Sequence, residues 1–264
     1  MKQTIPKPIV LSIAGHDPSG GAGIQADIET LAAFGCHAAT AITCLTIQDS
    51  GNVHELIPLS AELITRQVEA LVQDYPIGAI KIGLIGSAEA AFAIGELLVR
   101  HAEIPVVLDP ILAAGGGTEL AGESLVEAIL GQIIPHTSLV TPNSQEARRL
   151  TQRQQLEMCA HELLAGGCEA VLITGTHEAA TDVTNTLYRK GVPHHSERWP
   201  RLDGSYHGSG CTIAAAIAAG LARKSPLVEA VSEAQRYTWE SLVAGWRPGK
   251  GQHIPDRFYR RPSE

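Results

Sequence analysis

The sequence lacks the marks of several large protein classes. Its five cysteines are an odd number and form no CxxC pair, so we expect reduced thiols rather than a disulfide framework. Lysine and arginine are scattered, apart from a short arginine-rich stretch at 257–261, and the net charge is −8. A nucleic-acid-binding protein needs clustered basic residues to neutralise phosphates. The composition therefore argues against that class.

Long hydrophobic runs are also absent. No apolar stretch approaches the length of a membrane span, and the run from Ile9 to Ala14 is too short for the apolar region of a signal peptide. Internal repeats, low-complexity segments and linkers are missing as well. We therefore expect a soluble, cytoplasmic protein whose 264 residues fold as a single α/β domain, residues 1–264.

Short β-prone runs alternate with helix-prone segments along the chain. The predicted strands are 8–14, 38–45, 56–59, 79–82, 105–108, 138–140 and 170–173, with a hairpin over 183–199; the predicted helices are 24–34, 60–74, 87–101, 122–130, 209–222 and 227–246. This alternation predicts a mostly parallel sheet covered by helices on both faces. Glycine-rich or acidic loops follow four of the strands, so we expect them to converge on the carboxyl edge of that sheet.

The stretch 204–222 is the strongest candidate for a site. It is glycine-rich and then alanine-rich, which predicts a turn running directly into a buried helix. Gly208, Ser209 and Gly210 leave the backbone open to a ligand, and the free N–H groups of a helix start favour an anion such as phosphate. Cys211 lies where the pKa of a thiol tends to fall, which makes it a candidate proton acceptor. The alternative is an ordinary loop and cap with an inert buried cysteine.

A second glycine-rich turn, 15–23, joins the first strand to the first helix. It matches neither the dinucleotide-binding pattern nor the P-loop. Asp17 and Asp27 bracket the turn and could hydrogen-bond a polar ligand. The alternative, which the sequence alone favours, is ordinary turn chemistry for Asp17 and a surface helical position for Asp27.

Asn143 and Glu146 stand three residues apart at a predicted helix start. Their side chains therefore face the same way, and an amide oxygen with a carboxylate suits a Mg²⁺ shell that includes water. The alternative is a capping box, with Asn143 as the cap and Glu146 at the third helical position. Taken alone, these two residues favour the capping box.

Three of these motifs together resemble the hydroxymethylpyrimidine/phosphomethylpyrimidine kinases of the ribokinase-like superfamily. The motifs are GHDPSGGAGIQAD at 15–27, HGSGCT at 207–212, and TPN at 141–143 with Glu146. Ribokinase-type sugar kinases usually carry Asp at the position of Cys211, so the cysteine favours the pyrimidine branch. The resemblance implies a three-layer α/β/α ribokinase-like fold, ATP and Mg²⁺ as cofactors, a homodimer, and successive phosphorylation of 4-amino-5-hydroxymethyl-2-methylpyrimidine and its monophosphate in thiamine diphosphate biosynthesis.

The resemblance also implies roles for individual residues. They are, for the substrate, Asp27, Gln48, Gly15 and Gly21; for the transferring phosphate, Gly208, Ser209 and Gly210, with Cys211 as the base; for the nucleotide, Thr174, Gly175 and Asn143; and for magnesium, through water, Asn143 and Glu146.

Two loops depart from the family pattern. Residues 174–177 read Thr-Gly-Thr-His where the family often has Lys-Gly-Gly-His, and the loop after Asp109 lacks a frequent lysine. The loss of two cations near the phosphates motivates one alternative, a catalytically weak pyrimidine-binding protein. Another alternative is a pyridoxal-type kinase, because pyridoxal is also a flat heteroaromatic ring bearing a hydroxymethyl group.

Overall fold

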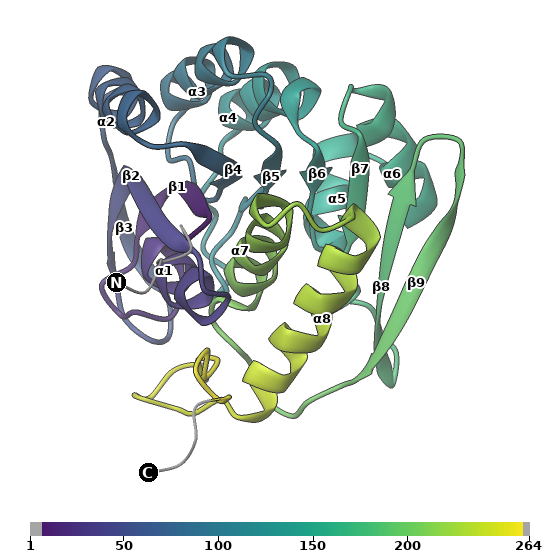
Figure 1. Ribbon diagram of the computed structural model, residues 1–264. Helices are drawn as coiled ribbons and strands as arrows, with labels where there is room; N and C mark the ends of the chain where they lie inside the picture. Colours follow the sequence, from purple (N-terminus) through teal and green to yellow (C-terminus); the bar gives the residue numbers. More distant parts are fainter. Residues whose placement is uncertain (1–6, 261–264) are drawn as a thin grey trace, which may run out of the picture.

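One twisted sheet runs through the whole molecule (Figure 1). The computed structural model describes residues 7–260, and its nine-stranded sheet has the order β3-β2-β1-β4-β5-β6-β7-β8-β9. In this order, the neighbouring strands from β2 through β1 and β4 to β7 pair in parallel. Strand β3 is an antiparallel addition at one edge, and β8 and β9 are antiparallel additions at the other. The strands are β1 (Ile9–His16), β2 (His37–Gln48), β3 (Val53–Pro58), β4 (Ile77–Ile82), β5 (Val106–Leu108), β6 (Leu139–Val140), β7 (Ala170–Ile173), β8 (Asp182–Arg189) and β9 (Val192–Pro200).

Helices cover both faces of the sheet, as Figure 1 shows. The helices are α1 (Gly23–Ala33), α2 (Ala61–Asp74), α3 (Ala88–Arg100), α4 (Glu123–Ala128), α5 (Ser144–Thr151), α6 (Leu156–Ala165), α7 (Ser209–Ala222) and α8 (Leu227–Val243). Because side chains alternate along a strand, β1 contributes Leu11 and Ile13 to the core under α2–α6 and Val10 to the core under α1, α7 and α8. The predicted three-layer α/β/α fold is confirmed.

The alanine-rich helix α7 lies at the centre of the second layer. All of its residues from Cys211 to Gly220 are buried, as expected for a helix that is apolar on every side. A Cβ atom on Gly220 would lie 2.6 Å from the Cβ of Ala230 in α8. Small side chains therefore allow α7 to pack closely between the sheet and α8.

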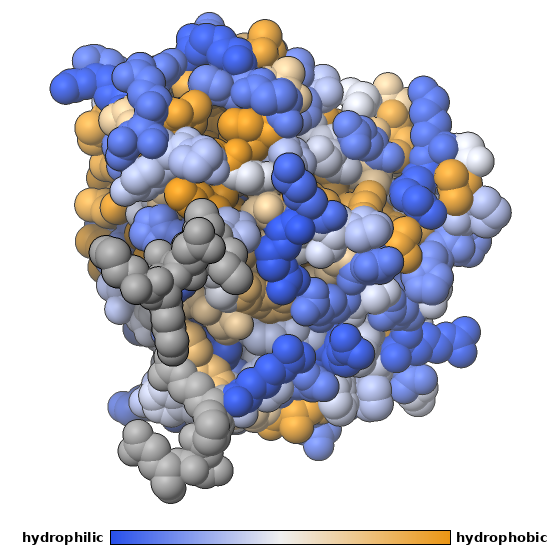
Figure 2. Space-filling model, in the orientation of Figure 1, coloured by the Kyte–Doolittle hydropathy of each residue, from blue (hydrophilic) through white to orange (hydrophobic). Residues whose placement is uncertain are grey.

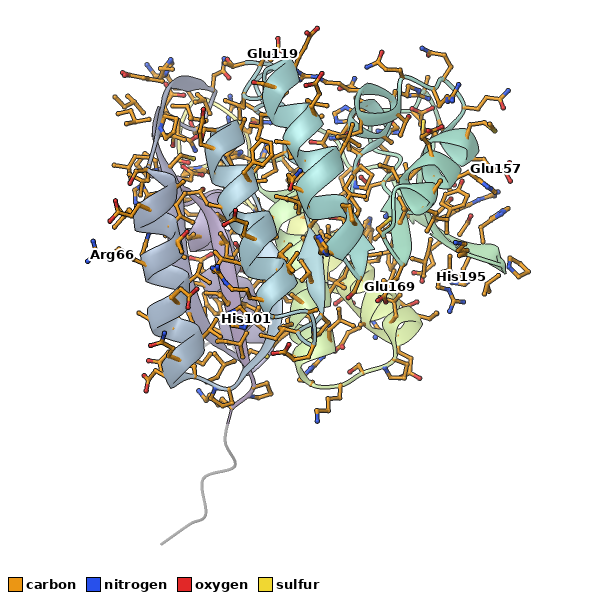
Figure 3. All side chains as sticks on the ribbon, turned by 90° about the horizontal axis from the view of Figure 1, so that it is seen from above. Arg66, His101, Glu119, Glu157, Glu169 and His195 are labelled. Carbon is orange, nitrogen blue, oxygen red and sulfur yellow. The ribbon has the colours of Figure 1, made fainter. Side chains whose placement is uncertain are left out.

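The carboxyl ends of the parallel strands meet at one edge of the sheet. In Figure 3, Glu119, which lies in the loop after β5, appears at the top of the view, while His101 and Glu169, which precede strands, lie lower. The loops predicted to carry chemistry therefore converge on one side of the molecule.

Some element boundaries differ from the prediction. Strand β2 extends to Gln48, beyond the predicted end at residue 45, and helix α6 has no counterpart among the predicted helices. Helix α8 ends at Val243 rather than at Trp246, because the N–H of Trp246 pairs with the carbonyl of Ile254 instead. Ser60 caps α2 as predicted, since its hydroxyl accepts a hydrogen bond from the N–H of Leu63. Within residues 7–260, no helix has the length and apolar character needed to cross a membrane.

Candidate active site

A cavity of about 520 Å³ follows the carboxyl edge of the sheet. At one end it is bounded by Thr46, Gln48 and Val53, from β2 and β3, and at the other by Trp199 and Trp239, from β9 and α8. The strand order places these two ends of the cavity toward opposite edges of the sheet. The cavity can therefore hold two ligands end to end.

The start of α7 forms the middle of this cavity. Gly208 precedes the helix with a φ of 84°, a left-handed conformation that favours glycine, and the first helical bond runs from the N–H of Thr212 to the carbonyl of Gly208. The N–H groups of Ser209, Gly210 and Cys211 thus have no acceptor within the helix. All three residues line the cavity, so the predicted anion site is brought to the place where a phosphate would bind.

Asp109, at the end of β5, lies directly over this helix start. A Cβ atom on Gly210 would be 3.4 Å from its Oδ2, and that oxygen has no hydrogen-bond partner although it is buried. Burial raises the pKa of Asp109 to about 6, against the opposing attraction of Lys81. The sequence analysis did not assign Asp109 to the site.

Cys211 lines the cavity beside Asp109. Its expected low pKa is wrong: burial raises the pKa of the thiol to about 12, and the nearby Asp109 raises it further, although Lys81 opposes this. The dipole of α7 is therefore outweighed by the loss of water around the sulfur. The thiol is neutral at neutral pH and lies beside the Asp109 carboxylate, whose pKa it lowers.

Asp27 does not reach the cavity wall. It is fully buried in α1, where its carboxylate lies 2.9 Å from Lys81 Nζ and accepts a hydrogen bond of 2.6 Å from the Ser12 hydroxyl. Both the expected contact with substrate and the surface position considered as its alternative are therefore corrected. Asp27 instead balances the charge of a buried lysine.

Asp17 combines turn chemistry with a contact across the site. It accepts hydrogen bonds from the backbone N–H groups of Ser19 (2.8 Å) and Ala22 (2.7 Å), as a turn aspartate should, and it also lies 2.8 Å from His207 Nε2. Burial raises the pKa of Asp17, but the bonds from His207 and Ser19 lower it by more, so the net shift is downward. Asp17 is held as a carboxylate that orients His207.

Gln48 lies beside the anion site. Its Nε2 is 3.3 Å from His207 Nε2, and His207 immediately precedes Gly208. Gln48, His207 and Gly15 all line the cavity, whereas Gly21 does not: a Cβ atom on Gly21 would collide with the His207 ring. An amide that offers both a donor and an acceptor therefore lies next to the phosphate position.

Asn143 and Glu146 form the capping box that the sequence favoured. The Asn143 side chain accepts from the N–H groups of Gln145 and Glu146, each at 2.9 Å, and the Glu146 carboxylate accepts from the N–H of Asn143 at 2.9 Å. Both residues also line the cavity. Burial, followed by repulsion from Asp109, raises the pKa of Glu146 to about 8. Capping and exposure to the cavity are therefore compatible.

The carboxylates in this part of the cavity suit a hard cation such as Mg²⁺. Within residues 7–260, no group of three or more His, Cys, Asp or Glu side chains could hold a metal by itself. Glu146 and Asp109 are nevertheless two buried carboxylates, the charge of Asp109 raises the pKa of Glu146, and the Asp109 Oδ2 atom lacks a hydrogen-bond partner. Mg²⁺ typically binds one or two carboxylates and completes its shell with water and substrate phosphates, so these residues fit the ion.

The far end of the cavity is aromatic and amide-rich. The rings of Trp199 and Trp239 lie 6.0 Å apart, and Gln235 accepts hydrogen bonds from the Trp199 indole (3.3 Å) and from Asn185 (3.0 Å). Thr174 lines this region, but Gly175 does not, because it packs against the backbone of β8.

Two cations near the site, Lys81 and Arg201, were not predicted from the sequence, and both already have partners within the protein. Lys81 is fully buried under the anion site; burial lowers its pKa, but the nearby Asp27, Cys211 and Asp109 raise it by more. Arg201 lines the cavity, and its guanidinium donates to the carbonyls of residues 176, 178 and 180. A charged residue inside the apolar strand 79–82 was a sequence signal that could have identified Lys81.

Comparison with known proteins identifies close relatives of this chain. A family model described as phosphomethylpyrimidine kinase matches residues 17–256. The chain is 38% identical over 266 residues to a hydroxymethylpyrimidine/phosphomethylpyrimidine kinase of Rhizobium meliloti, covering 96% of this chain and 97% of that protein. It is 35% identical to the thiamine biosynthesis bifunctional protein ThiED of Geobacter sulfurreducens, covering 93% of this chain and 51% of that protein.

Solved structures share the architecture. Pyridoxal kinase from Staphylococcus aureus in complex with AMP-PCP and pyridoxal superposes with a TM-score of 0.86 at 26% sequence identity, and the match covers 97% of this chain and 96% of that one. That protein holds a nucleotide analogue and a heteroaromatic alcohol together, which agrees with a cavity long enough for two ligands.

Proposed function

The chain belongs to the phosphomethylpyrimidine kinase family, and from this premise we propose that it transfers the γ-phosphoryl group of ATP to 4-amino-5-hydroxymethyl-2-methylpyrimidine and then to the resulting monophosphate, in thiamine diphosphate biosynthesis. One observation carries the substrate assignment: the Gln48 side chain lines the cavity 3.3 Å from His207, beside the anion site at the start of α7. An aminopyrimidine presents a ring-nitrogen acceptor next to an amino donor, which a side-chain amide can bind on both sides.

Positioning and charge stabilisation account for most of the catalysis in phosphoryl transfer. The N–H groups at the start of α7 bind the transferring phosphoryl group. The aromatic end of the cavity, with Trp199, Trp239 and Thr174, takes the nucleotide base and sugar, so that the phosphates reach the middle of the cavity. Glu146 and Asn143 would hold Mg²⁺ through water, and the ion would neutralise charge on the phosphates.

In this scheme the substrate hydroxyl gives its proton to Cys211, and the thiol proton of Cys211 moves to Asp109. The Cys211 thiol is neutral and therefore cannot accept a proton without giving one up. As the hydroxyl oxygen bonds to phosphorus, its proton passes to Cys211 Sγ while the thiol proton passes to the neighbouring Asp109 carboxylate. Asp109, with a pKa of about 6, is ionised and ready to accept at neutral pH.

The test compares two alcohols in the wild-type protein and in Gln48→Leu. We expect kcat/KM with ATP to be higher for the hydroxymethylpyrimidine than for pyridoxal, and Gln48→Leu to raise the KM for the pyrimidine while changing the KM for ATP less. The loss should be about 1–3 kcal/mol, the cost of an unsatisfied buried partner. Equal preference in the wild type would instead favour a pyridoxal-type kinase, and binding without turnover would favour a pyrimidine-binding protein.

We also propose that the protein is a cytoplasmic homodimer. Leu45, Ile47 and Ile57 are 40–51% exposed on the antiparallel pair β2 and β3, where Leu45 lies opposite Ile57. Figure 2 shows hydrophobic residues along the left margin, the side on which Figure 1 places these strands. An apolar patch next to an edge strand is a surface that a second copy can cover. Ile47→Glu should shift the mass measured by light scattering from dimer to monomer; a monomeric wild type would refute the proposal.

A further inference from the structure

Arg257 is buried although it lies outside the cavity. It follows α8 and is 1% exposed. Its Nε donates to the Thr212 hydroxyl at 3.0 Å, its Nη1 donates to Glu29 Oε2 at 3.0 Å, and its Nη2 donates to the carbonyl of Gly21. The Tyr237 hydroxyl donates to the Arg257 carbonyl at 2.6 Å. All three nitrogens of the guanidinium are therefore committed.

The acceptors of Arg257 belong to the two segments that build the site. Gly21 lies in the glycine-rich turn that carries Asp17, and Thr212 lies in the first turn of α7, where its hydroxyl donates to the carbonyl of Gly208 at 2.8 Å. The two segments touch at Gly208: a Cβ atom there would lie 1.9 Å from the Gly21 carbonyl oxygen and 2.8 Å from Arg257 Nη2. The guanidinium thus joins the turn to the helix start from behind the cavity.

Stability alone does not explain a buried arginine at this place. A buried ion pair often contributes little net stability relative to apolar residues of similar volume, and the carboxylate that pairs with Arg257, Glu29, is 43% exposed. A planar guanidinium can, however, donate along several fixed directions at once, which lysine cannot do. The geometry therefore suits a group that fixes a distance between two backbone segments.

We propose that Arg257 is a positioning residue that sets the separation between the glycine turn and the start of α7. This inference rests on the proposed function, in which the acceptor alcohol lies near the turn and the phosphoryl group lies on the helix N–H groups. A misplacement of about 1 Å can cost about 100-fold in rate. Arg257 touches no substrate, and it acts through Gly21 and Thr212.

The first experiment measures coupling in Arg257→Lys. ADP and the phosphorylated alcohol are quantified in the same reaction, together with kcat and the KM of each substrate. We expect kcat to fall about 10- to 100-fold, the KM for ATP to stay within about twofold, and ADP to exceed phosphorylated product because water replaces a misplaced alcohol. Arg260→Lys is the matched control, since Arg260 lies in the same segment but pairs with Glu240 at the surface; it should behave like the wild type.

A purely structural role gives a different result. If Arg257→Lys only reduces the folded fraction, measured by circular dichroism and urea titration, kcat falls in proportion while KM values and the one-to-one ratio of ADP to product are unchanged. That outcome overturns the inference. The assay uses whichever of the two alcohols the wild type phosphorylates, so a wrong substrate assignment is seen in the wild type and a wrong positioning role in the variant. A wild type that phosphorylates neither overturns the proposed function and this inference with it.

A second variant, Thr212→Val, guards against misfolding of Arg257→Lys. Valine keeps the volume and branching of threonine but removes the hydroxyl that links Arg257 to Gly208. We expect a smaller loss of coupling in a variant that is less stable to urea, because Arg257 Nε loses its acceptor, but that is still folded under the assay conditions. Combining both substitutions should cause no further loss of coupling. Wild-type coupling in Thr212→Val, or independent losses that multiply in the double variant, contradicts the positioning role.

Discussion

The buried pair of Asp27 and Lys81 makes a quantitative prediction about stability. Their charged atoms are 2.9 Å apart and both side chains are fully buried. With an effective dielectric constant of about 20, Coulomb's law gives an attraction of about 6 kcal/mol at this distance. Removing one partner leaves a buried charge unpaired, which typically costs about 3–5 kcal/mol. We therefore expect Lys81→Met to lower the free energy of unfolding by about that amount.

A double-mutant cycle in urea tests the pair directly. Lys81→Met and Asp27→Leu should each be strongly destabilising, and the double variant should be less destabilised than the sum of the two, because it leaves no unpaired charge. Arg66→Met is the control, since Arg66 forms an exposed pair with Glu62 at 3.8 Å and projects from the periphery of its layer in Figure 3; it should leave the unfolding curve unchanged. Additive losses, or single losses below about 1 kcal/mol, would refute the reasoning.

The same variants separate a structural role of Asp27 from substrate binding. Asp27→Asn keeps the shape of the side chain and removes its charge, so the folded fraction should fall while the KM of the remaining active enzyme for the pyrimidine alcohol stays within about twofold. A large rise in that KM with unchanged stability would restore the substrate contact implied by the family resemblance.

Two further predictions concern the chemistry. The pKa of Asp109 is raised to about 6 and its ionised form accepts the proton, so kcat/KM at saturating Mg²⁺ should fall as the pH drops through about 6. Asp109→Asn should lose both the activity and this acidic limb of the pH profile. A limb near pH 9 that is abolished in Cys211→Ser would point to a thiolate base instead. Glu146→Gln should raise the Mg²⁺ concentration needed for half-maximal rate. It should not lower the melting temperature, because glutamine still accepts the capping hydrogen bond from the N–H of Asn143. A lower melting temperature with an unchanged Mg²⁺ response would assign Glu146 to capping alone.

Local patterns in the sequence were enough to predict the layered fold and the start of α7. Alternating strands and helices determine the architecture, and the glycine-to-alanine transition at 208–214 marks a turn before a buried helix. Contacts between distant segments could not be predicted in this way. The burial that raises the pKa of Cys211, and the pairing of Asp27 with Lys81, depend on residues 54 or more positions apart.

Gln48 shows the same limit at the level of one element. The family resemblance implied that it belongs to the site, but its neighbour His207 is 159 residues away, and no periodicity in the sequence relates the two. Arg257 is a further example, since an arginine in a short arginine-rich stretch normally predicts a solvated side chain, yet here it is 1% exposed.

The position of α7 in the second layer has a consequence for synthesis of the chain. Val10, Ala79 and Val107, on the central strands, are covered on one face by Ile213 and Ile217 of α7, which are made more than 100 residues after Val107. At about 5–20 residues per second, the ribosome needs roughly 5–20 s to close that gap. During this interval the first strands can already pair, but one face of the nascent sheet remains open to water. The growing chain is therefore a natural client for chaperones that bind exposed apolar surfaces during translation.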